Sequence, residues 1–400
     1  MRILPSLQAA LLFTLPMAVM AQFTQVHLGL AGTSLEAIDF PTPLIGYAAG
    51  KDGALYKSTD GGANWSAVST GSGAYLFSVD FLDENTGFVS GGGATVLRTM
   101  DGGANWTPLV LPFTECVYQV QVISATLVYA AGWGGNFFRS TNVGDNWTAI
   151  TIDPNWQGWV FSMDFQDADN GWVAQTDGRI YRTANGGLNW TESTTTTDNT
   201  LRGISMPDAN TGYAAGFFGT VQKSENSGAT WSTINTGYPG DSYYSVHFTD
   251  AMNGVICGGF YAGSWQGVIM RTANGGSTWT RIYSGGPVLN GITINDGNIF
   301  AVGANEVIIT DALGTDVGSP RWPDTIHVSP NPCSDQLQIT SPAHGIATWF
   351  RLTTLAGAVL QRGAVHNGLI DTSALAPGCY LLDVFDAAHG SLGMVRVVKP

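Results

Sequence analysis

One repeated position in the sequence carries side chains that could perform acid–base or metal chemistry. It falls near the end of seven strand-like segments and holds Asp39, Asp80, Gln121, Asp164, Ser205, His247 and Thr293. If these segments surround a channel, Asp39, Asp80, Asp164 and His247 would share one level, as a cation site or as the paired carboxylates of a hydrolase. The alternative is that each side chain faces the neighbouring segment and bonds backbone there.

Basic and imidazole side chains suggest no further catalytic group. The six histidines show neither HxH nor HExxH spacing. Six basic residues each directly precede a repeated turn motif: Lys57, Arg98, Arg139, Arg182, Lys223 and Arg271. Because they lie one repeat apart, we expect local roles on a carboxylate or aromatic face of the next repeat. Beyond the channel candidates, the sequence assigns no catalytic residue, metal ligand or cofactor.

The turn motif consists of Ser or Thr, Asp or Asn two residues on, Gly four on and Trp seven on. Its six copies place these residues at Ser58, Asp60, Gly62 and Trp65; Thr99, Asp101, Gly103 and Trp106; Ser140, Asn142 and Trp147; Thr183, Asn185 and Trp190; Ser224, Asn226 and Trp231; and Thr272, Asn274 and Trp279. Successive tryptophans are 41, 41, 43, 41 and 48 residues apart. This period is typical of propellers and solenoids.

Short segments of alternating polar and apolar residues, typical of β-strands, flank each copy of the motif in a fixed order. Each repeat unit contains four of them. In the second unit they begin near Leu76, Gly87, Thr95 and Trp106. Four antiparallel strands form one propeller blade. First strands recur near Leu35, Leu76, Val117, Val160, Leu201, Tyr243 and Leu289. The pattern predicts an all-β fold, a seven-bladed β-propeller over residues 22–314.

The seventh unit lacks its own fourth strand, because its motif decays to Thr310–Gly314 with no tryptophan. At the other end of the chain, residues 23–29 (FTQVHLG) match residues 65–71 (WSAVSTG). We therefore expect the N-terminal strand to complete the last blade. This closure leaves no terminal edge open to pairing with another chain.

The motif resembles the Asp box of sialidases and related propellers, and the whole unit resembles the propeller family of photosystem II assembly and stability factors. The resemblance covers residues 23–314 and implies a structural role for the boxes, whose Ser/Thr and Asp side chains bond backbone N–H groups of the turn. Asn142, Asn185, Asn226 and Asn274 replace the acid in four boxes, which favours turn stabilisation over metal binding. The arginine-containing N-terminal motif of sialidases is absent.

The composition and the net charge disfavour several classes of binding partner. Sixteen Lys+Arg against 30 Asp+Glu give a formal net charge of −14. This disfavours nucleic acid and anionic lipid as partners. It also disfavours a photosystem assembly role, since that family's docking surface is basic. Arg2, an apolar run to Met20, and Val19 and Ala21 predict a signal peptide over residues 1–21, and hence a secreted or surface location. No other stretch reaches membrane-spanning length, so the mature chain is expected to lack a transmembrane helix.

The sequence repeat stops after Gly314. A linker at residues 315–324 follows, and after it come new segments in which polar and apolar residues alternate. Residues 325–400 are expected to form a small Ig-like β-sandwich. They resemble the type A sorting domain of the type IX secretion system of Gram-negative bacteria, which implies export through that machinery to the outer-membrane surface. The matching motif residues include Pro330, Asn331, Pro332, Gly378, Tyr380 and Lys399. Cys379 stands where that family usually has an aliphatic residue.

The four cysteines match neither a metal knuckle nor a redox pair. Cys116 and Cys257 are expected to be buried thiols, while Cys333 and Cys379 could form a bridge.

Two functions follow. The favoured one is a non-enzymatic binding or scaffolding propeller at the cell surface, with an extracellular protein or glycan as ligand. It would use aromatic residues expected to be exposed outside the boxes: Trp133, Trp156, Trp159, Tyr238, Tyr243, Tyr244, Tyr261 and Trp265. The alternative is an exported glycoside hydrolase that uses Asp39, Asp80 and Asp164.

Overall fold

The structure is a computed structural model, which describes residues 23–28, 33–155 and 157–311, and the segments 327–329, 336–340, 349–354, 359–365, 369–376, 378–385 and 391–399. The chain divides into two compact units, with the boundary between Thr315 and Asp316. Each unit consists of β-strands and is described by itself. Among the described residues, no helix is long and apolar enough to cross a membrane.

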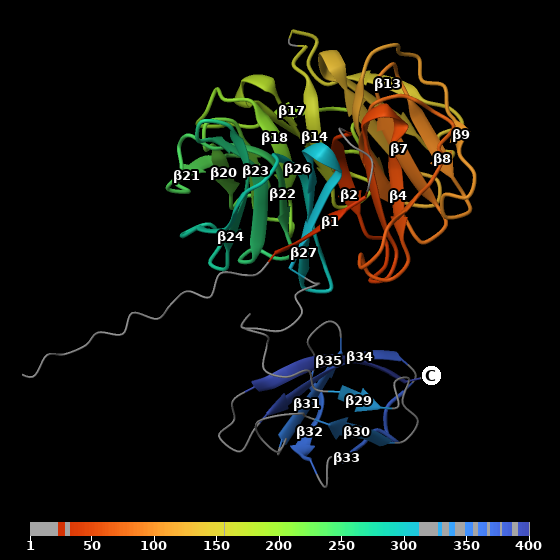
Figure 1. The fold of residues 1–400 in the computed structure, drawn as a ribbon, viewed down its shortest axis with the longest axis vertical. Helices are drawn as coiled ribbons and strands as arrows, with labels where there is room; N and C mark the ends of the chain where they lie inside the picture. Colours follow the sequence, from red (N-terminus) through yellow and green to blue (C-terminus); the bar gives the residue numbers. More distant parts are fainter. Residues whose placement is uncertain are drawn as a thin grey trace, which may run out of the picture. The chain divides into compact units, whose positions relative to one another are not determined.

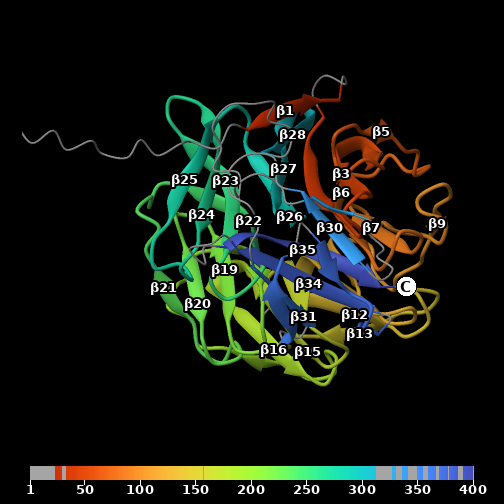
Figure 2. The same cartoon turned by 90° about the horizontal axis from the view of Figure 1, so that it is seen from below.

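Seven four-stranded antiparallel sheets make up the larger unit and surround a common centre (Figures 1 and 2). The first, innermost strands are β2 (Leu35–Asp39), β6 (Leu76–Phe81), β10 (Val117–Val122), β14 (Val160–Phe165), β18 (Leu201–Ser205), β22 (Ser242–Phe248) and β26 (Leu289–Asn295). The second strands are β3 (Gly46–Gly50), β7 (Gly87–Gly91), β11 (Val128–Gly132), β15 (Asn170–Gln175), β19 (Gly212–Gly216), β23 (Gly254–Tyr261) and β27 (Asn298–Gly303). The seven-bladed propeller predicted from the repeat is confirmed.

The outer half of each blade is shorter. The third strands are β4 (Leu55–Ser58), β8 (Val96–Thr99), β12 (Asn136–Ser140), β16 (Ile180–Ala184), β20 (Val221–Ser224), β24 (Trp265–Thr272) and β28 (Val307–Thr310). The fourth strands are β5 (Ser66–Ala67), β9 (Thr107–Pro108), β13 (Thr148–Thr151), β17 (Thr191–Glu192), β21 (Ser232–Ile234), β25 (Thr280–Gly285) and β1 (Thr24–His27). Short 3-10 turns link some second and third strands: η1 (Lys51–Gly53), η2 (Trp133–Gly135), η3 (Thr176–Gly178) and η4 (Ala304–Glu306).

The seventh blade combines both ends of the propeller. Its sheet order is β1-β28-β27-β26, and Thr24–His27 pairs antiparallel with Val307–Thr310. In Figure 2 the N-terminal strand, drawn in red, lies beside the cyan strands. Phe23 meets Tyr283 of the sixth blade edge-to-face, with ring centroids 5.4 Å apart. The outer strand therefore also contacts the neighbouring blade.

Blades pack face to face through aromatic side chains. Tyr47 in the second strand of blade one stacks on Phe81 in the first strand of blade two, with ring centroids 3.7 Å apart. The same pairing joins Tyr129 to Phe165 at 4.1 Å and Tyr213 to Phe248 at 3.5 Å. Each such pair adds about 0.5–1.5 kcal/mol to the apolar burial. The same aromatic contact therefore stabilises three of the blade interfaces.

The smaller unit contains two antiparallel sheets. One has the order β29 (His327–Ser329), β30 (Gln336–Thr340) and β33 (Leu369–Asp371); the other has β32 (Val359–Ala364), β31 (Trp349–Thr354), β34 (Gly378–Phe385) and β35 (Ser391–Lys399). Leu337 and Ile370 of the first sheet share one buried cluster with Leu352, Leu382 and Val397 of the second. Strand β32 was not expected from the sequence.

Some predicted features of this unit lie outside the described residues. They include Pro330, Asn331 and Pro332, and the side chains of Cys333 and Cys379, so the proposed bridge is not described. Tyr380 is buried, and its hydroxyl donates to the Ala376 carbonyl at 2.6 Å. Gly378 pairs with Lys399 at the end of the β34–β35 ladder.

Candidate functional site

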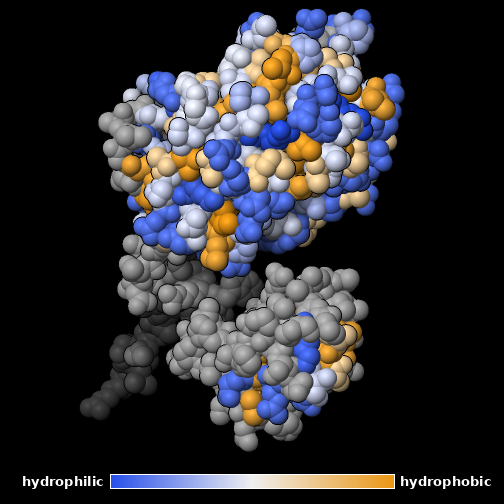
Figure 3. All heavy atoms as spheres, turned by 90° about the vertical axis from the view of Figure 1, so that its right-hand side faces the viewer, coloured by the Kyte–Doolittle hydropathy of each residue, from blue (hydrophilic) through white to orange (hydrophobic). Residues whose placement is uncertain are grey.

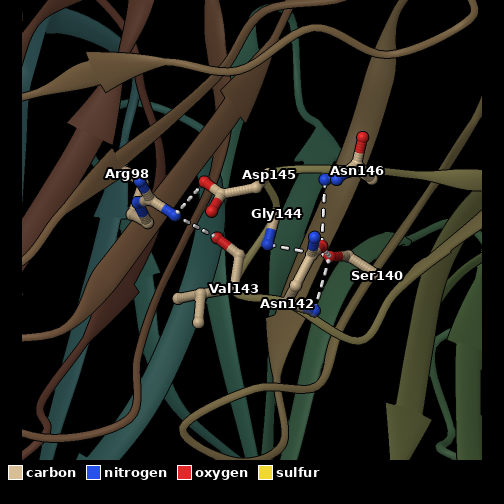
Figure 4. A network of polar contacts seen from close by, with 7 residues as sticks. All are labelled: Arg98, Ser140, Asn142, Val143, Gly144, Asp145 and Asn146. Carbon is tan, nitrogen blue, oxygen red and sulfur yellow. Dashed lines mark hydrogen bonds and ion pairs between the residues drawn. The ribbon is translucent and has the colours of Figure 1, made fainter.

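The Asp boxes form the turns between third and fourth strands. In the third box the Ser140 hydroxyl accepts the Gly144 N–H at 2.8 Å, and Asn142 Oδ1 accepts the Asn146 N–H at 2.9 Å (Figure 4). The Ser/Thr hydroxyl accepts the glycine N–H in every box, at 2.8–3.0 Å. Asn142 thus bonds backbone as Asp60 does, through Oδ1 to the Asn64 N–H. The box side chains stabilise turns.

Basic residues before the boxes connect neighbouring blades. Arg98 Nη1 donates to the Val143 carbonyl and to Asp145 Oδ1, both at 2.7 Å and both in the next box (Figure 4). Lys57 Nζ donates to the Gly102 carbonyl of the next box at 2.7 Å. Lys223 instead pairs with Glu225 of its own box at 2.7 Å. These cations act locally rather than on a shared substrate.

The predicted channel residues bond to backbone in the next blade. Asp39 Oδ2 accepts the Phe81 N–H at 2.9 Å, Asp80 Oδ2 accepts the Val122 N–H at 2.6 Å, and Asp164 Oδ2 accepts the Met206 N–H at 2.6 Å. Gln121 and Ser205 accept the equivalent N–H groups of Phe165 and Phe248 at 2.9 and 3.1 Å. Because adjacent first strands belong to separate sheets, these side chains link blades where no ladder exists.

These contacts are those of the alternative interpretation, in which each side chain bonds backbone of the neighbouring segment. Each is engaged by a different blade, whereas a glycosidase needs two carboxyl groups facing one bond. Within the described residues, no group of three or more His, Cys, Asp or Glu could hold a metal ion. His247 lies on the channel wall, and burial lowers its pKa, which keeps the imidazole neutral.

A different position of the first strands turns into the channel. In all seven blades the register between first and second strands shifts by one residue, between Leu35 and Ala37 in blade one and at the same place in the others. Such a bulge leaves one residue unpaired and re-aims its side chain. The unpaired residues are Glu36, Phe77, Tyr118, Phe161, Arg202, Tyr244 and Asn290. We call this set the bulge ring.

The bulge ring lines a cavity of about 620 Å³ in the centre of the propeller. Tyr75 and Trp159, which precede two of the first strands, line it as well. Asp39, Asp80 and His247 lie three residues after the bulge in their strands and line the same cavity. Asp164 is not part of this wall. The volume falls in the range of ligand pockets, about 300–1,000 Å³.

Aromatic rings form a continuous arc of the cavity wall. Phe77 lies 5.3 Å from Tyr118, and Tyr118 lies 5.0 Å from Phe161, measured between ring centroids. The Arg202 guanidinium follows, 4.2 Å from the Phe161 centroid and 5.6 Å from that of Tyr244. The opposite arc is polar: Glu36 Oε1 accepts from the Tyr75 hydroxyl, and from Asn290 Nδ2 at 3.1 Å. The cavity thus combines flat apolar faces with a few fixed polar groups.

The bulge ring and several exposed aromatic side chains lie at the same end of the propeller. The bulges adjoin the turns between second and third strands, where Trp133, Phe218, Tyr261 and Trp265 are exposed by 39, 70, 66 and 51%. The boxes lie at the opposite end, because the third strands run the other way. On the side drawn in Figure 3, hydrophobic residues are scattered among hydrophilic ones. The end with the bulge ring is therefore the candidate binding face.

The expected set of exposed aromatic residues was correct only in part. Trp133, Tyr261 and Trp265 are exposed, but Tyr243 is fully buried in the first strand of blade six. Trp159 and Tyr244 line the cavity, and Arg281 lies 3.9 Å from the centroid of Tyr238. Trp156 lies outside the described residues. Cys257 is buried as expected, whereas Cys116 is only partly buried.

Comparison with known proteins agrees with this architecture. The family model described as photosynthesis system II assembly factor YCF48 matches residues 64–204. A structure of YCF48 bound to D1 peptide has a TM-score of 0.61 at 16% identity, covering 72% of this chain and 94% of that chain. YCF48 from Cyanidioschyzon merolae has a TM-score of 0.61 at 22% identity, covering 72% and 98%.

The propeller is similar in fold to YCF48. The WD40 β-propeller domain of Doa1 has a TM-score of 0.58 at 11% identity, covering 73% of this chain and 95% of that domain. None of the curated proteins matches the chain. Similarity to solved structures at these identities concerns the fold, so function must be argued from the site.

Buried channel acids make stability depend on pH. Burial, together with the charges of Asp39 and Asp164, raises the pKa of Asp80 to about 8. A carboxyl whose pKa is higher in the folded state favours folding while it is protonated. Its contribution is present below about pH 4, the unfolded value, and is lost as the pH rises through about 8. Asp80→Asn removes the charge and keeps an oxygen that can accept the Val122 N–H.

We therefore predict that Asp80→Asn gains melting temperature relative to wild type as the pH rises from 5 to 8.5, by about 2 °C or more. Calorimetry or thermal scanning at several pH values measures this difference. The matched control is Asp198→Asn, an exposed acid, for which the difference should stay flat. A wild-type-like pH profile for Asp80→Asn would show that Asp80 is not held protonated by burial.

Proposed function

We propose that this chain is a non-enzymatic binding propeller that takes a segment of a partner protein into the bulge-ring cavity. The observation that supports this most directly is the bulge in every first strand, which directs seven side chains of mixed chemistry at one space. The propeller fold does not require these side chain types at the bulge. Five other residues, near the ends of the first strands, already accept hydrogen bonds from the backbone of the next blade.

The size and lining of the cavity favour a flexible segment as ligand. About 620 Å³ admits a few side chains rather than a folded domain. Exposed aromatic residues around the same end can contact the flanking parts of the segment, and aromatic side chains are enriched at binding hot spots. The similar propeller YCF48 has been solved with a peptide bound. A glycan is the other ligand class that aromatic walls accept, and the experiment below distinguishes the two.

Site-specific photocrosslinking on intact cells tests this function. We expect a benzophenone amino acid in place of Tyr118, on the bulge ring, to capture a discrete protein. The same group in place of Leu188, an exposed box residue at the opposite end, should capture nothing comparable. A protein captured only from position 188 would contradict the proposed face. Turnover of a polysaccharide by the purified chain, with no capture from position 118, would contradict the function.

We also propose that the chain acts outside the cytoplasm. The signal peptide over residues 1–21 and the resemblance of residues 325–400 to a type A sorting domain support export by the type IX machinery. The second unit's buried cluster, to which both sheets contribute, suits an independent β-domain. Its partners would then be the secretion machinery first and an extracellular protein afterwards.

Removal of residues 325–400 should abolish surface delivery while the propeller remains folded. Protease accessibility on intact cells and fractionation would measure delivery, and thermal unfolding of the truncated protein would measure folding. Efficient surface display of the truncated chain would show that export does not depend on this unit.

A further inference from the structure

The charged residues that line the cavity are mostly acids. Glu36 belongs to the bulge ring, Asp39 and Asp80 also line the cavity, and Arg202 is the one Lys or Arg among the lining residues. Glu36 and Asp39 are three residues apart on β2, or about 10 Å at about 3.3 Å per residue. The acids therefore occupy two levels of the cavity along the strands. The whole chain has the same sign, with a formal net charge of −14.

Arg202 shows how the cavity accommodates a cation. Its guanidinium lies between the rings of Phe161 and Tyr244, at 4.2 and 5.6 Å from their centroids. Aromatic faces attract cations through the ring quadrupole. Burial lowers the pKa of Arg202, while Glu36 and three tyrosines oppose this effect. The remaining rings of the arc, Phe77 and Tyr118, offer faces of the same kind.

Glu36 is held in position by three donors on a single oxygen. Its Oε1 accepts from Ser34 Oγ at 2.9 Å, from Asn290 Nδ2 at 3.1 Å and from the Tyr75 hydroxyl. Within the described residues, no hydrogen bond to its Oε2 is seen. A carboxylate fixed through one oxygen on the wall of an aromatic cavity can accept a charge-assisted hydrogen bond with the other.

We propose that the segment bound in this cavity presents a lysine or arginine side chain, with its charge on Glu36 and its stem along Phe77 and Tyr118, and with Asp39 and Asp80 adding to the attraction. This inference rests on the proposed binding function and specifies its ligand. The acidic chain would attract a basic segment over longer distances. An acidic segment bound to Arg202 would meet three carboxyl groups around a single cation.

Binding of a cationic side chain should release protons from the acids of the cavity. Burial raises the pKa of Asp39 to about 7 and is the largest cause that raises the pKa of Asp80 to about 8, so both acids are partly protonated in the free protein near neutral pH. A cation in the cavity favours their ionised forms. Burial also raises the pKa of Glu36, against the hydrogen bonds from Tyr75 and Ser34 and the charge of Arg202. Asp39 and Asp164 contribute to the raised pKa of Asp80, and burial lowers the pKa of His247. Affinity for a basic segment should therefore rise with pH up to about 8.

The test is a titration of the full chain with capped peptides Gly-Ser-X-Ser-Gly, where X is Lys, Gln or Glu, followed by NMR or calorimetry. We expect the Lys peptide to bind at least about tenfold more tightly than the Gln peptide, and its affinity to rise between pH 6 and 8.5. Glu36→Gln should remove about tenfold of the Lys affinity, and Asp80→Asn should flatten the pH dependence. Glu84→Gln, an exposed acid remote from the cavity, should change neither.

Two results would overturn the inference in distinguishable ways. If the Gln or Glu peptide bound as tightly as the Lys peptide and Tyr118→Ala abolished this binding, the cavity would bind segments without preference for a cation, and the proposed function would stand. If no peptide bound while the variants remained folded by circular dichroism, both the cationic ligand and the segment-binding function would be wrong.

Discussion

The close approach of first and second strands at the bulge is the constraint on which the site depends. In six blades the second-strand residue that pairs with the residue just before the bulge is glycine, and a Cβ there would lie 2.0–2.2 Å from a backbone oxygen at the start of the first strand. A Cβ at that distance would force the backbone apart. Gln175 occupies this position in blade four, where the bulge persists and the side chain amide is buried without a partner. Glycine therefore permits the close approach in the other six blades, whereas the bulge itself also forms with Gln175.

The residues that stabilise the propeller and the residues that line its cavity occupy different positions along the strands. Box side chains bond their own turns, basic residues before the boxes bond the next blade, and the acids at the ends of the first strands bond the backbone of the next first strand. These contacts repeat around the ring, since they serve the fold. The bulge ring instead carries five residue types in seven blades, with an acid, a base, an amide and four aromatic rings, which is expected of a surface that recognises an asymmetric ligand.

The sequence predicted the repeated features well and the bulge ring not at all. Six boxes in phase and the match of residues 23–29 to 65–71 were sufficient for seven blades. Strict alternation places Asp39 and its equivalents on the channel side, and the bulge breaks this alternation at Glu36. The sequence does mark the bulge position. It is the residue of varying type that follows the hydrophobic residue at the start of each first strand, such as Arg202 after Leu201. Tyr243 was misassigned because it occupies that buried start.

The most direct test of this account is the unfolding free energy of Gly91→Ala against that of Gly92→Ala. A Cβ at position 91 would lie 2.2 Å from the Tyr75 backbone oxygen, whereas at position 92 the same oxygen is 3.9 Å away. We predict a loss of about 2 kcal/mol or more for Gly91→Ala and less than about 0.5 kcal/mol for Gly92→Ala, measured by chemical denaturation. Equal and small losses would contradict the claim that the close approach of the two strands at position 91 requires glycine.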